Sequence, residues 1–319
     1  MLVVPLHVLH VLHGDSCGLQ CVVQRLSAEL PGNRHFRRLV TLGVIMSDVV
    51  RQYYDETELE EWDRLASPYR RFELLSTLRL VDEFFPRSGR IADIGGGPGR
   101  YTIELLQRDY RVTLIDLSEA NVRFARDRLA ERGLSAESVH VADARTLPML
   151  ATASFDAALE LGPMYHIIDA GERRRTLAEL YRILKPGSPA IVGFINPWGV
   201  LRGGLTEFPQ SYSDAPLLRQ LLSTFVKAGK PDMFTESVFL TPPQALAELR
   251  SSGFAVECRA GVEGFASGAR GPVTEMAQND PSAYAVVADL VPETATHPAF
   301  RDCTEHLHVV VHKITFDPV

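Results

Sequence analysis

The stretch IADIGGGPGRYT, residues 91–102, constrains the fold of this chain more than any other part of the sequence. A short apolar run with one acid leads into four glycines within five positions, and a helical pattern follows. Glycine has no Cβ atom, so the main chain of such a loop can come close to a ligand. In α/β folds, a turn of this kind after a strand lies at the carboxyl ends of the strands, where ligands bind. The stretch therefore predicts a ligand-binding loop between a strand and a helix.

Short segments rich in Val, Ile and Leu alternate with helical segments along the rest of the chain. The helical segments have recognisable ends, such as Ser118 as an N-cap and Gly133 as a stop. Parallel neighbouring strands need crossover connections, so the alternation predicts a doubly wound α/β sheet with parallel strands. The candidate strands are residues 90–94, 112–116, 138–142, 155–160, 189–195, 254–260 and 306–313.

Two helices are expected before the first strand. The first follows the N-cap Ser47 and extends to Leu65, and the second ends at Pro86. We assign residues 46–88 to these cap helices and interpret residues 1–45 as an extension that is dispensable for the fold. A straight helix cannot surround a metal ion with its own ligands, so we predict no metal site in the extension. Its potential ligands share one helix face: His7, His10, His13, Cys17 and Cys21.

The charge balance and the cysteines limit the possible partners and the compartment. The 319 residues carry a formal net charge of −7, so no basic field attracts nucleic acid or an anionic membrane surface. The four cysteines are too scattered for a disulfide framework, which favours a reducing cytoplasm. No segment approaches the roughly 20 uninterrupted apolar residues of a membrane helix. These features favour a cytoplasmic protein that acts on a small ligand.

The glycine-rich loop does not match two common nucleotide motifs. A dinucleotide fingerprint that starts at Gly95 needs a glycine where the chain has Arg100, and a phosphate-binding loop needs Lys followed by Ser or Thr. Asp93 would repel a phosphate but could bind the cationic amine of a zwitterionic ligand. Asp116 ends the next strand, at the distance from the loop where a carboxylate accepts both hydroxyls of a ribose. Asp143 closes the third strand and could accept a hydrogen bond from an adenine amino group.

This set of motifs resembles the class I, Rossmann-like, S-adenosylmethionine-dependent methyltransferases of the small-molecule type. The resemblance covers roughly residues 50–319 and follows the order DIGGGPG, LIDLS, VADA, FDAALELGPMYHI and ILKPGSPAIVGFI. It implies seven strands, of which the last is antiparallel. It also implies that the glycine loop holds the methionine part of S-adenosylmethionine, Asp116 the ribose and Asp143 the adenine. The implied cofactor residues are Asp93, Gly95, Gly96, Gly97, Asp116, Leu117, Asp143, Ala144, Glu160, Leu161 and Tyr54.

The segment after the fourth strand bears on the methyl acceptor. It lacks the Asn or Asp followed by Pro-Pro and an aromatic that DNA amino-methyltransferases carry, and it lacks a nucleophilic cysteine, so nucleic acid is disfavoured. Small-molecule methyltransferases that resemble this chain often have LGP-x-YH there, with the Tyr and His facing the substrate. We predict that His166 is a catalytic base and that Tyr165 orients the acceptor. The alternatives are that His166 caps or packs the following helix and that Tyr165 belongs to the core.

Residues 196–240 exceed an ordinary connection, so we predict a lid or substrate cap after the fifth strand. Their aromatic side chains could line an acceptor pocket or form a core of the lid itself: Trp198, Phe208, Tyr212, Phe225, Phe234 and Phe239. On the last strand, His306, His308 and His312 share one sheet face, and a packed or exposed face is favoured over a metal site.

The sequence as a whole predicts methyl transfer to oxygen, nitrogen or carbon of a small metabolite, by a monomer or homodimer. The alternative is a non-catalytic relative that binds S-adenosylmethionine or serves as a scaffold.

Overall fold

The computed structural model describes residues 48–227 and 235–314. The chain divides between Val49 and Val50 into two compact units, and the second unit, Val50–Val319, contains the sheet and its helices. The predicted extension, with its His and Cys side chains, lies outside the described residues.

The glycine-rich loop connects a seven-stranded sheet to its first crossover helix. The strand order is β3-β2-β1-β4-β5-β9-β8, and β9 runs antiparallel to both of its neighbours. This confirms the predicted sheet with an antiparallel last strand, and each predicted strand is present within one or two residues at its ends. The strands are β1 Arg90–Ile94, β2 Arg111–Asp116, β3 Ser138–Val141, β4 Ala157–Glu160, β5 Pro189–Ile195, β8 Phe254–Gly261 and β9 His306–Lys313.

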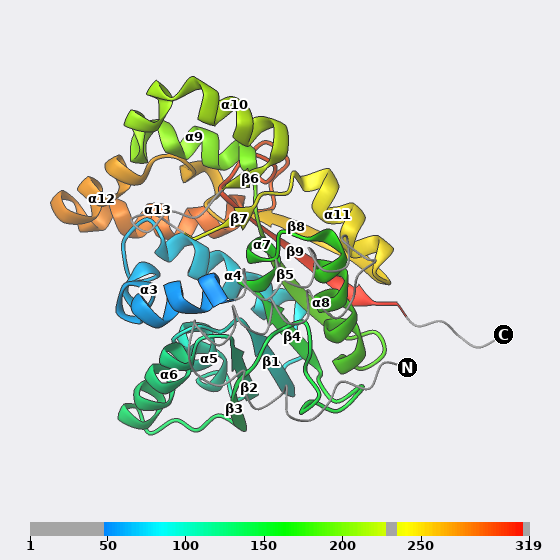
Figure 1. Ribbon diagram of the computed structural model, residues 1–319. Coiled ribbons are helices and arrows are strands. Elements are labelled where there is room, and N and C mark those ends of the chain that lie inside the picture. The colour runs from blue at the N-terminus through cyan, green and yellow to red at the C-terminus, as the bar shows by residue number, and fades with distance from the viewer. Residues whose placement is uncertain (1–47, 228–234, 315–319) are drawn as a thin grey trace, which may run out of the picture. The chain divides into compact units, whose positions relative to one another are not determined.

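Helices cover both faces of the sheet, which explains why its central strands are apolar along their whole length. One face packs against α4, α5 and α6, and the other packs against α8 and α11. Figure 1 shows α5 and α6 on one side of the strands and α8 and α11 on the other. The bounds are α4 Arg71–Phe84, α5 Arg100–Leu106, α6 Glu119–Glu131, α8 Ala170–Ile183 and α11 Pro242–Ser251.

The structure confirms both predicted ends of α6. The Ser118 hydroxyl accepts a hydrogen bond of 3.0 Å from the Asn121 N–H, and Gly133 takes the left-handed φ of +63° just after the helix. Because Ser118 follows β2 so closely, its cap fixes the turn that carries the strand-end acid Asp116.

The N-terminal segment contains one helical break more than we predicted. Residues 50–56 are helical, and this helix ends before Thr57, which is not helical. A separate helix, α3, Glu58–Arg64, then precedes α4. Acidic residues in the first turn of α3 favour a new helix start there, because they face the positive end of the helix dipole. The predicted single helix to Leu65 is therefore two helices.

The region after β5 contains helices and a small hairpin. The segment 228–234 and the predicted lid residue Phe234 lie outside the described residues. Phe239 is buried, whereas Trp198 is 45% exposed and contacts the ring of Phe225 at 5.8 Å. The elements are α9 Pro197–Glu207, η2 Pro209–Ser213, α10 Ala215–Thr224, β6 Val226–Lys227 and its antiparallel partner β7 Ser237–Val238.

A second helical region, which we did not predict, joins β8 to β9. It consists of η3 Gly264–Ala266, α12 Arg270–Asn279 and α13 Pro281–Thr294. In Figure 1, α9 and α10 lie beyond one end of the sheet, with α12 and α13 next to them. In the described part of the chain, no helix has both the length and the apolar character needed to cross a lipid bilayer.

Candidate active site

The glycine loop is fixed by hydrogen bonds to the end of β2. The Gly95 and Gly96 N–H groups donate to the Ile115 carbonyl at 2.8 and 3.1 Å, and the Gly97 N–H donates to Oδ2 of Asp116 at 2.8 Å. These contacts bend the main chain back over the carboxyl ends of β1 and β2. The loop is therefore shaped by the protein itself, before any ligand contributes.

Two glycines of the loop are needed for different reasons. At Gly95, φ is +72° and an added Cβ would lie 2.6 Å from Cδ of Pro163, so the turn after β4 fills the space above it. At Gly97, φ is +54° and the nearest atom to an added Cβ is 3.9 Å away. Gly95 thus allows two strand-end turns to touch, whereas Gly97 leaves a space beside the main chain.

The predicted amine ligand, Asp93, is buried beneath this loop. Its Oδ2 accepts a hydrogen bond of 2.6 Å from the Thr102 hydroxyl and lies 2.8 Å from a Cβ built on Gly96. Burial raises the pKa of Asp93 to about 6, with Thr102 opposing the shift. In this arrangement Asp93 supports the loop from below.

The two other strand-end acids differ in their surroundings. Asp116 is buried, which raises its pKa, and its Oδ1 accepts from the Ser118 N–H at 2.9 Å. Asp143 is half-buried, and its Oδ1 and Oδ2 both accept from Nε of Arg145, at 2.9 and 3.0 Å respectively. Burial raises the pKa of Asp143, but the Arg145 hydrogen bonds outweigh it and lower the pKa overall. The predicted neighbours Leu117 and Ala144 are half-buried beside these acids.

The predicted acceptor-side residues lie on the short helix α7, Pro163–His166, which follows β4. His166 Nε2 shares a hydrogen bond of 2.8 Å with the Tyr54 hydroxyl, and His166 Nδ1 lies 3.4 Å from the Glu236 carbonyl. A carbonyl can only accept, so Nδ1 donates and Nε2 of the neutral ring accepts from Tyr54. Burial lowers the pKa of His166 to about 4. Tyr165 is half-buried next to it, with ring centroids 4.6 Å apart.

Comparison with known proteins agrees with this geometry. A family model described as a methyltransferase domain matches residues 91–187, from β1 to the turn before β5. The ubiquinone biosynthesis O-methyltransferase of Stutzerimonas stutzeri is 28% identical over 199 residues, which make up 61% of this chain and 78% of that protein. An O-methyltransferase of Pyrenophora dematioidea is 33% identical over 135 residues, 40% of this chain and 48% of that protein. Residues 91–187 of this chain therefore form a methyltransferase domain.

Solved structures show the same fold. The methyltransferase aligns with the 1,6-didemethyltoxoflavin N1-methyltransferase of Burkholderia thailandensis with a TM-score of 0.52 and 17% identity, over 86% of this chain and 91% of the other. The alignment with the Pyrenophora protein spans about half of that relative's length.

Among the predicted cofactor residues, Glu160 has the most unusual surroundings for a carboxyl group. It is the last residue of β4, it is fully buried, and neither carboxylate oxygen has a hydrogen-bond partner among the described residues. Burial alone raises its pKa to about 8. The next residue, Leu161, is also buried. We had predicted both as cofactor contacts, but nothing in the sequence indicated that the Glu160 carboxyl would be without a partner.

Asp55 links the N-terminal segment to the loop after β2. Its Oδ1 accepts from the Ser118 hydroxyl at 2.6 Å and from the Ala120 N–H at 3.2 Å. The sequence offered no signal for this contact, because its partners are distant along the chain.

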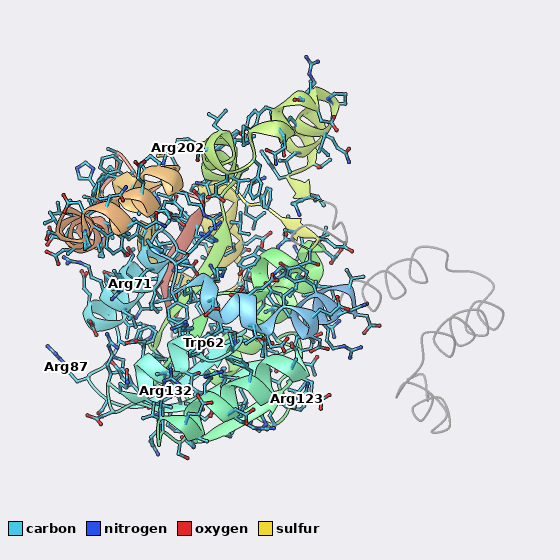
Figure 2. The ribbon with its side chains drawn as sticks, turned by 90° about the vertical axis from the view of Figure 1, so that its left-hand side faces the viewer. Trp62, Arg71, Arg87, Arg123, Arg132 and Arg202 are labelled. Carbon is cyan, nitrogen blue, oxygen red and sulfur yellow. The ribbon has the colours of Figure 1, made fainter. Side chains whose placement is uncertain are left out.

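Trp62 links the same segment to α5 and α6. The Arg100 guanidinium lies 3.8 Å from the centre of its ring, and that of Arg132 lies 5.3 Å away. Trp62 and Arg132 lie close together in Figure 2. The segment before α4 is therefore held against both α5 and the C-terminal end of α6.

A buried polar cluster lies where β9 begins, opposite the end of β5. His306 Nδ1 is 2.6 Å from Glu263 Oε1 and 4.0 Å from Glu73, which also contacts Arg64 at 2.6 Å. Burial lowers the pKa of His306, but Glu73 and Glu263 outweigh it and raise the pKa overall. Ligand atoms of Glu263, Glu305 and His306 lie within 4.8 Å of one another. These groups already have protein partners, since Glu305 accepts from Tyr69 at 2.6 Å.

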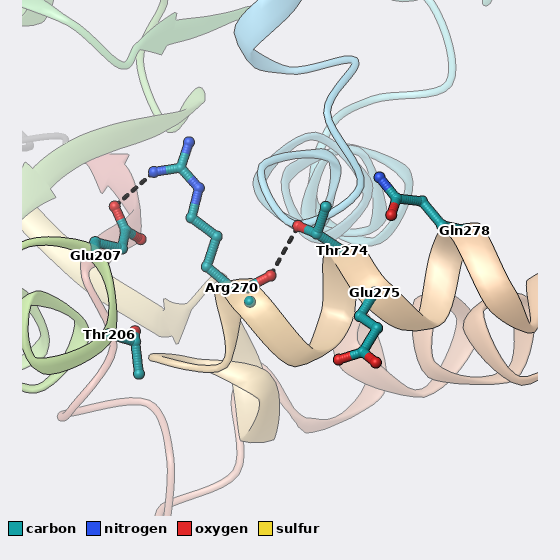
Figure 3. Close-up of a pocket in the computed structure, with 7 residues that line it drawn as sticks. Thr206, Glu207, Arg270, Thr274, Glu275 and Gln278 are labelled. Atoms are coloured by element: carbon teal, nitrogen blue, oxygen red, sulfur yellow. Dashed lines mark hydrogen bonds and ion pairs between the residues drawn. The ribbon is translucent and has the colours of Figure 1, made fainter.

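A separate hollow lies between α9 and α12. It has a volume of about 550 Å³ and is lined by polar side chains, with an ion pair of 2.6 Å between Glu207 and Arg270 (Figure 3). None of its lining residues belongs to the glycine loop, β4 or α7. This hollow is therefore distinct from the site at the carboxyl ends of the strands.

Proposed function

We propose that this methyltransferase transfers a methyl group from S-adenosylmethionine to oxygen, nitrogen or carbon of a small metabolite. The observation that carries the proposal is the meeting of the glycine loop, two strand-end acids and α7 at one edge of the sheet. Methyl transfer from a sulfonium needs alignment more than chemical assistance, because the methyl group is already a good electrophile. The name of the Stutzerimonas relative, a ubiquinone biosynthesis O-methyltransferase, supports this substrate class.

The site residues fit the cofactor in two respects. The space beside Gly97 is what a close ligand approach requires, since a Cβ there would occupy it. Glu160 is a buried carboxyl without a partner among the described residues, and a cationic ligand would supply one. In our proposal, Gly95, Gly96 and Gly97 hold the methionine part, Asp116 the ribose and Asp143 the adenine. Asp93, Leu117, Ala144, Leu161 and Tyr54 shape the surrounding walls.

On the acceptor side, we propose that Tyr165 and His166 contact the substrate. His166 is positioned by Tyr54 on one ring nitrogen and by the Glu236 carbonyl on the other, so its ring orientation is fixed. A fixed neutral imidazole can orient an acceptor hydroxyl or amine by hydrogen bonding. The role of His166 as a base stays a prediction.

The surrounding helices suggest how acceptors are selected. We propose that residues 46–88 cap the cofactor side and that residues 196–240 form the lid or substrate cap. Exposed aromatic side chains on this insertion, such as Trp198 at 45% and Phe208 at 48% exposure, are consistent with contacts to a ligand. Residues 1–45 remain, in this proposal, a dispensable extension.

We further propose that the protein acts in the cytoplasm as a monomer or homodimer, without a nucleic-acid or membrane partner. The net charge of −7 and the four scattered cysteines support this.

The first test is calorimetric binding of S-adenosylmethionine to the full chain, followed by incubation with metabolite mixtures and mass spectrometry for the gain of one CH₂ unit. Gly97→Ala should weaken cofactor binding by about tenfold or more, because the methyl group fills the ligand space. Gly187→Ala is the matched control, since Gly187 has a φ of +74° and open space around it. Absence of binding would refute the proposal, and binding without turnover would support the non-catalytic alternative.

A further inference from the structure

Glu160 stands out because its fully buried carboxyl group has no hydrogen-bond partner among the residues that the structure describes. Buried polar side chains in native proteins are nearly always hydrogen-bonded, because desolvation without a partner costs free energy. Its place makes the exception informative. It ends β4 beside Ile94 of β1, directly before the glycine loop, and the turn after it contacts Gly95.

Within residues 48–227 and 235–314, the elements around Glu160 provide no compensating charge. Asp93 on β1 pairs in register with Leu159, so it faces the opposite side of the sheet. Tyr165 and His166 on α7 are held neutral, since burial raises the pKa of the tyrosine and lowers that of the histidine. β5 carries no titratable side chain. Lys227 and Glu236, at the β6–β7 hairpin, do not alter the pKa of Glu160, for which burial is the whole cause.

We propose that Glu160 is the proton acceptor of methyl transfer and that it becomes ionised only when a cationic cofactor lies in the site. The inference rests on the proposed function and deepens it. It implies that the acceptor carries a proton on the attacked atom, as a hydroxyl or an N–H group does.

The physical reason is the change of charge at the site. An opposite charge nearby favours the ionised form of a carboxyl group, so a bound sulfonium lowers the proton affinity of Glu160. Once the methyl group has left, the remaining thioether is neutral and this effect disappears. The carboxylate then regains the high proton affinity that its burial gives it. Glu160 therefore becomes a stronger base as the reaction proceeds.

The atoms and charges balance. The S–CH₃ bond breaks with its electron pair going to sulfur, a bond forms between the methyl carbon and the acceptor atom, and the acceptor proton passes to a carboxylate oxygen of Glu160. The site begins with one positive and one negative charge and ends with none. No other oxidant, reductant or reactant is needed.

His166 is less suited to this task. Its Nε2 is occupied by the Tyr54 hydroxyl, and burial lowers its pKa to about 4, so it holds a proton poorly at neutral pH. Both carboxylate oxygens of Glu160 lack a hydrogen-bond partner in the described part of the chain, and the pKa of Glu160 is raised to about 8. We therefore assign orientation to His166, and in this inference Glu160 replaces His166 as the predicted base.

The test is proton release on cofactor binding, measured at pH 7.5 by calorimetry in buffers with different ionisation enthalpies. With a pKa of about 8, Glu160 holds about three quarters of a proton at this pH and should release it when S-adenosylmethionine binds. S-adenosylhomocysteine, which carries no sulfonium, should release far less. Asp93, with a pKa of about 6, is already largely ionised and contributes little.

Glu160→Gln should abolish this extra release, whereas Glu131→Gln, on the exposed end of α6, should keep it. Any proton exchanged by the ammonium group of the cofactor itself is the same for every protein variant, so it cancels in this comparison. Turnover by Glu160→Gln should fall at least about a hundredfold, the usual range for losing a general base, while S-adenosylhomocysteine still binds. If the glutamine variant fails to fold, the difference between the two ligands on the wild-type protein decides.

Equal proton release with both ligands, or with wild type and Glu160→Gln, would overturn the assignment while leaving the methyltransferase function intact. Failure of both ligands to bind the folded wild-type protein would instead refute the proposed function and the inference together.

Discussion

At the scale of single residues, Asp116 has a structural role in addition to its proposed role as the ribose ligand. One carboxylate oxygen holds the Gly97 N–H and the other holds the Ser118 N–H, so a single side chain joins the glycine loop to the cap of α6. Its position was predictable because a strand-end acid at that distance from the glycines has few other uses. Its hydrogen-bond partners were not, because they depend on how the loop folds back in space.

Asp116→Asn should weaken S-adenosylmethionine binding by about tenfold to a hundredfold, equivalent to roughly 1.4–2.8 kcal/mol. The amide has one acceptor oxygen in place of two, so one main-chain contact or the ribose contact is lost. Asp169→Asn is the control, because Asp169 accepts from Glu172 N–H at the start of α8 in the same manner but away from the loop. Calorimetric titration of both variants measures the effect, and equal affinities would contradict the assigned role.

At the scale of elements, strands were easier to predict than helices. The central strands are buried on both faces, so they read as continuous apolar runs between turn residues. By contrast, α12 and α13 each bury one residue, Val273 and Val291, and α13 contains Pro292. A helix with so little buried surface has no clear apolar period, which explains why both escaped prediction.

The contact of Asp55 with Ser118 and Ala120 allows a test of how the helical segment 50–56 is held against the rest of the fold. Asp55→Ala removes the acceptor for Ser118 and Ala120, which should cost the docked segment about 1–2 kcal/mol, as other cap losses do. Limited proteolysis within residues 50–64 should then speed up roughly tenfold, because cleavage follows the population of the open form. Glu56→Ala is the control, since Glu56 is exposed and pairs with Gln52 on the same helix. Unchanged cleavage in Asp55→Ala would show that other contacts hold the segment.

At the scale of the whole molecule, the site is assembled from parts of the chain that the sequence keeps far apart. The parallel strands and the antiparallel last strand could be predicted, and with them the edge where the acids meet. The cluster of Arg64, Glu73, Glu263 and His306 could not, because α4, β8 and β9 come together only through the antiparallel pairing.

The free energy of unfolding should depend on pH through the raised pKa of Glu160. Its unfolded pKa is about 4.5 and its folded pKa about 8, so the folded protein binds the extra proton between these values and stability falls as pH rises. The slope is about 1.4 kcal/mol per pH unit well below pH 8 and levels off above it. His166 and His308, with lowered pKa values of about 4, act in the opposite direction, but only below about pH 6.5.

Urea denaturation of the ligand-free protein at pH 6.5 and pH 8 isolates this contribution. The stability of wild type relative to Glu160→Gln should fall by roughly 1–2 kcal/mol across that interval. Glu131→Gln should follow wild type. Parallel behaviour of wild type and Glu160→Gln would mean that the carboxyl group is ionised in the folded state.

The position of β9 between β5 and β8 imposes an order on folding during synthesis. β8 leaves the ribosome earlier, yet it has no hydrogen-bonding neighbour in the sheet until β9 has been inserted alongside β5. The edge strand β8 must therefore wait, with both of its edges unpaired, for a segment translated some fifty codons later. A pause in translation ahead of residue 306 would prolong that wait and expose the nascent chain to aggregation.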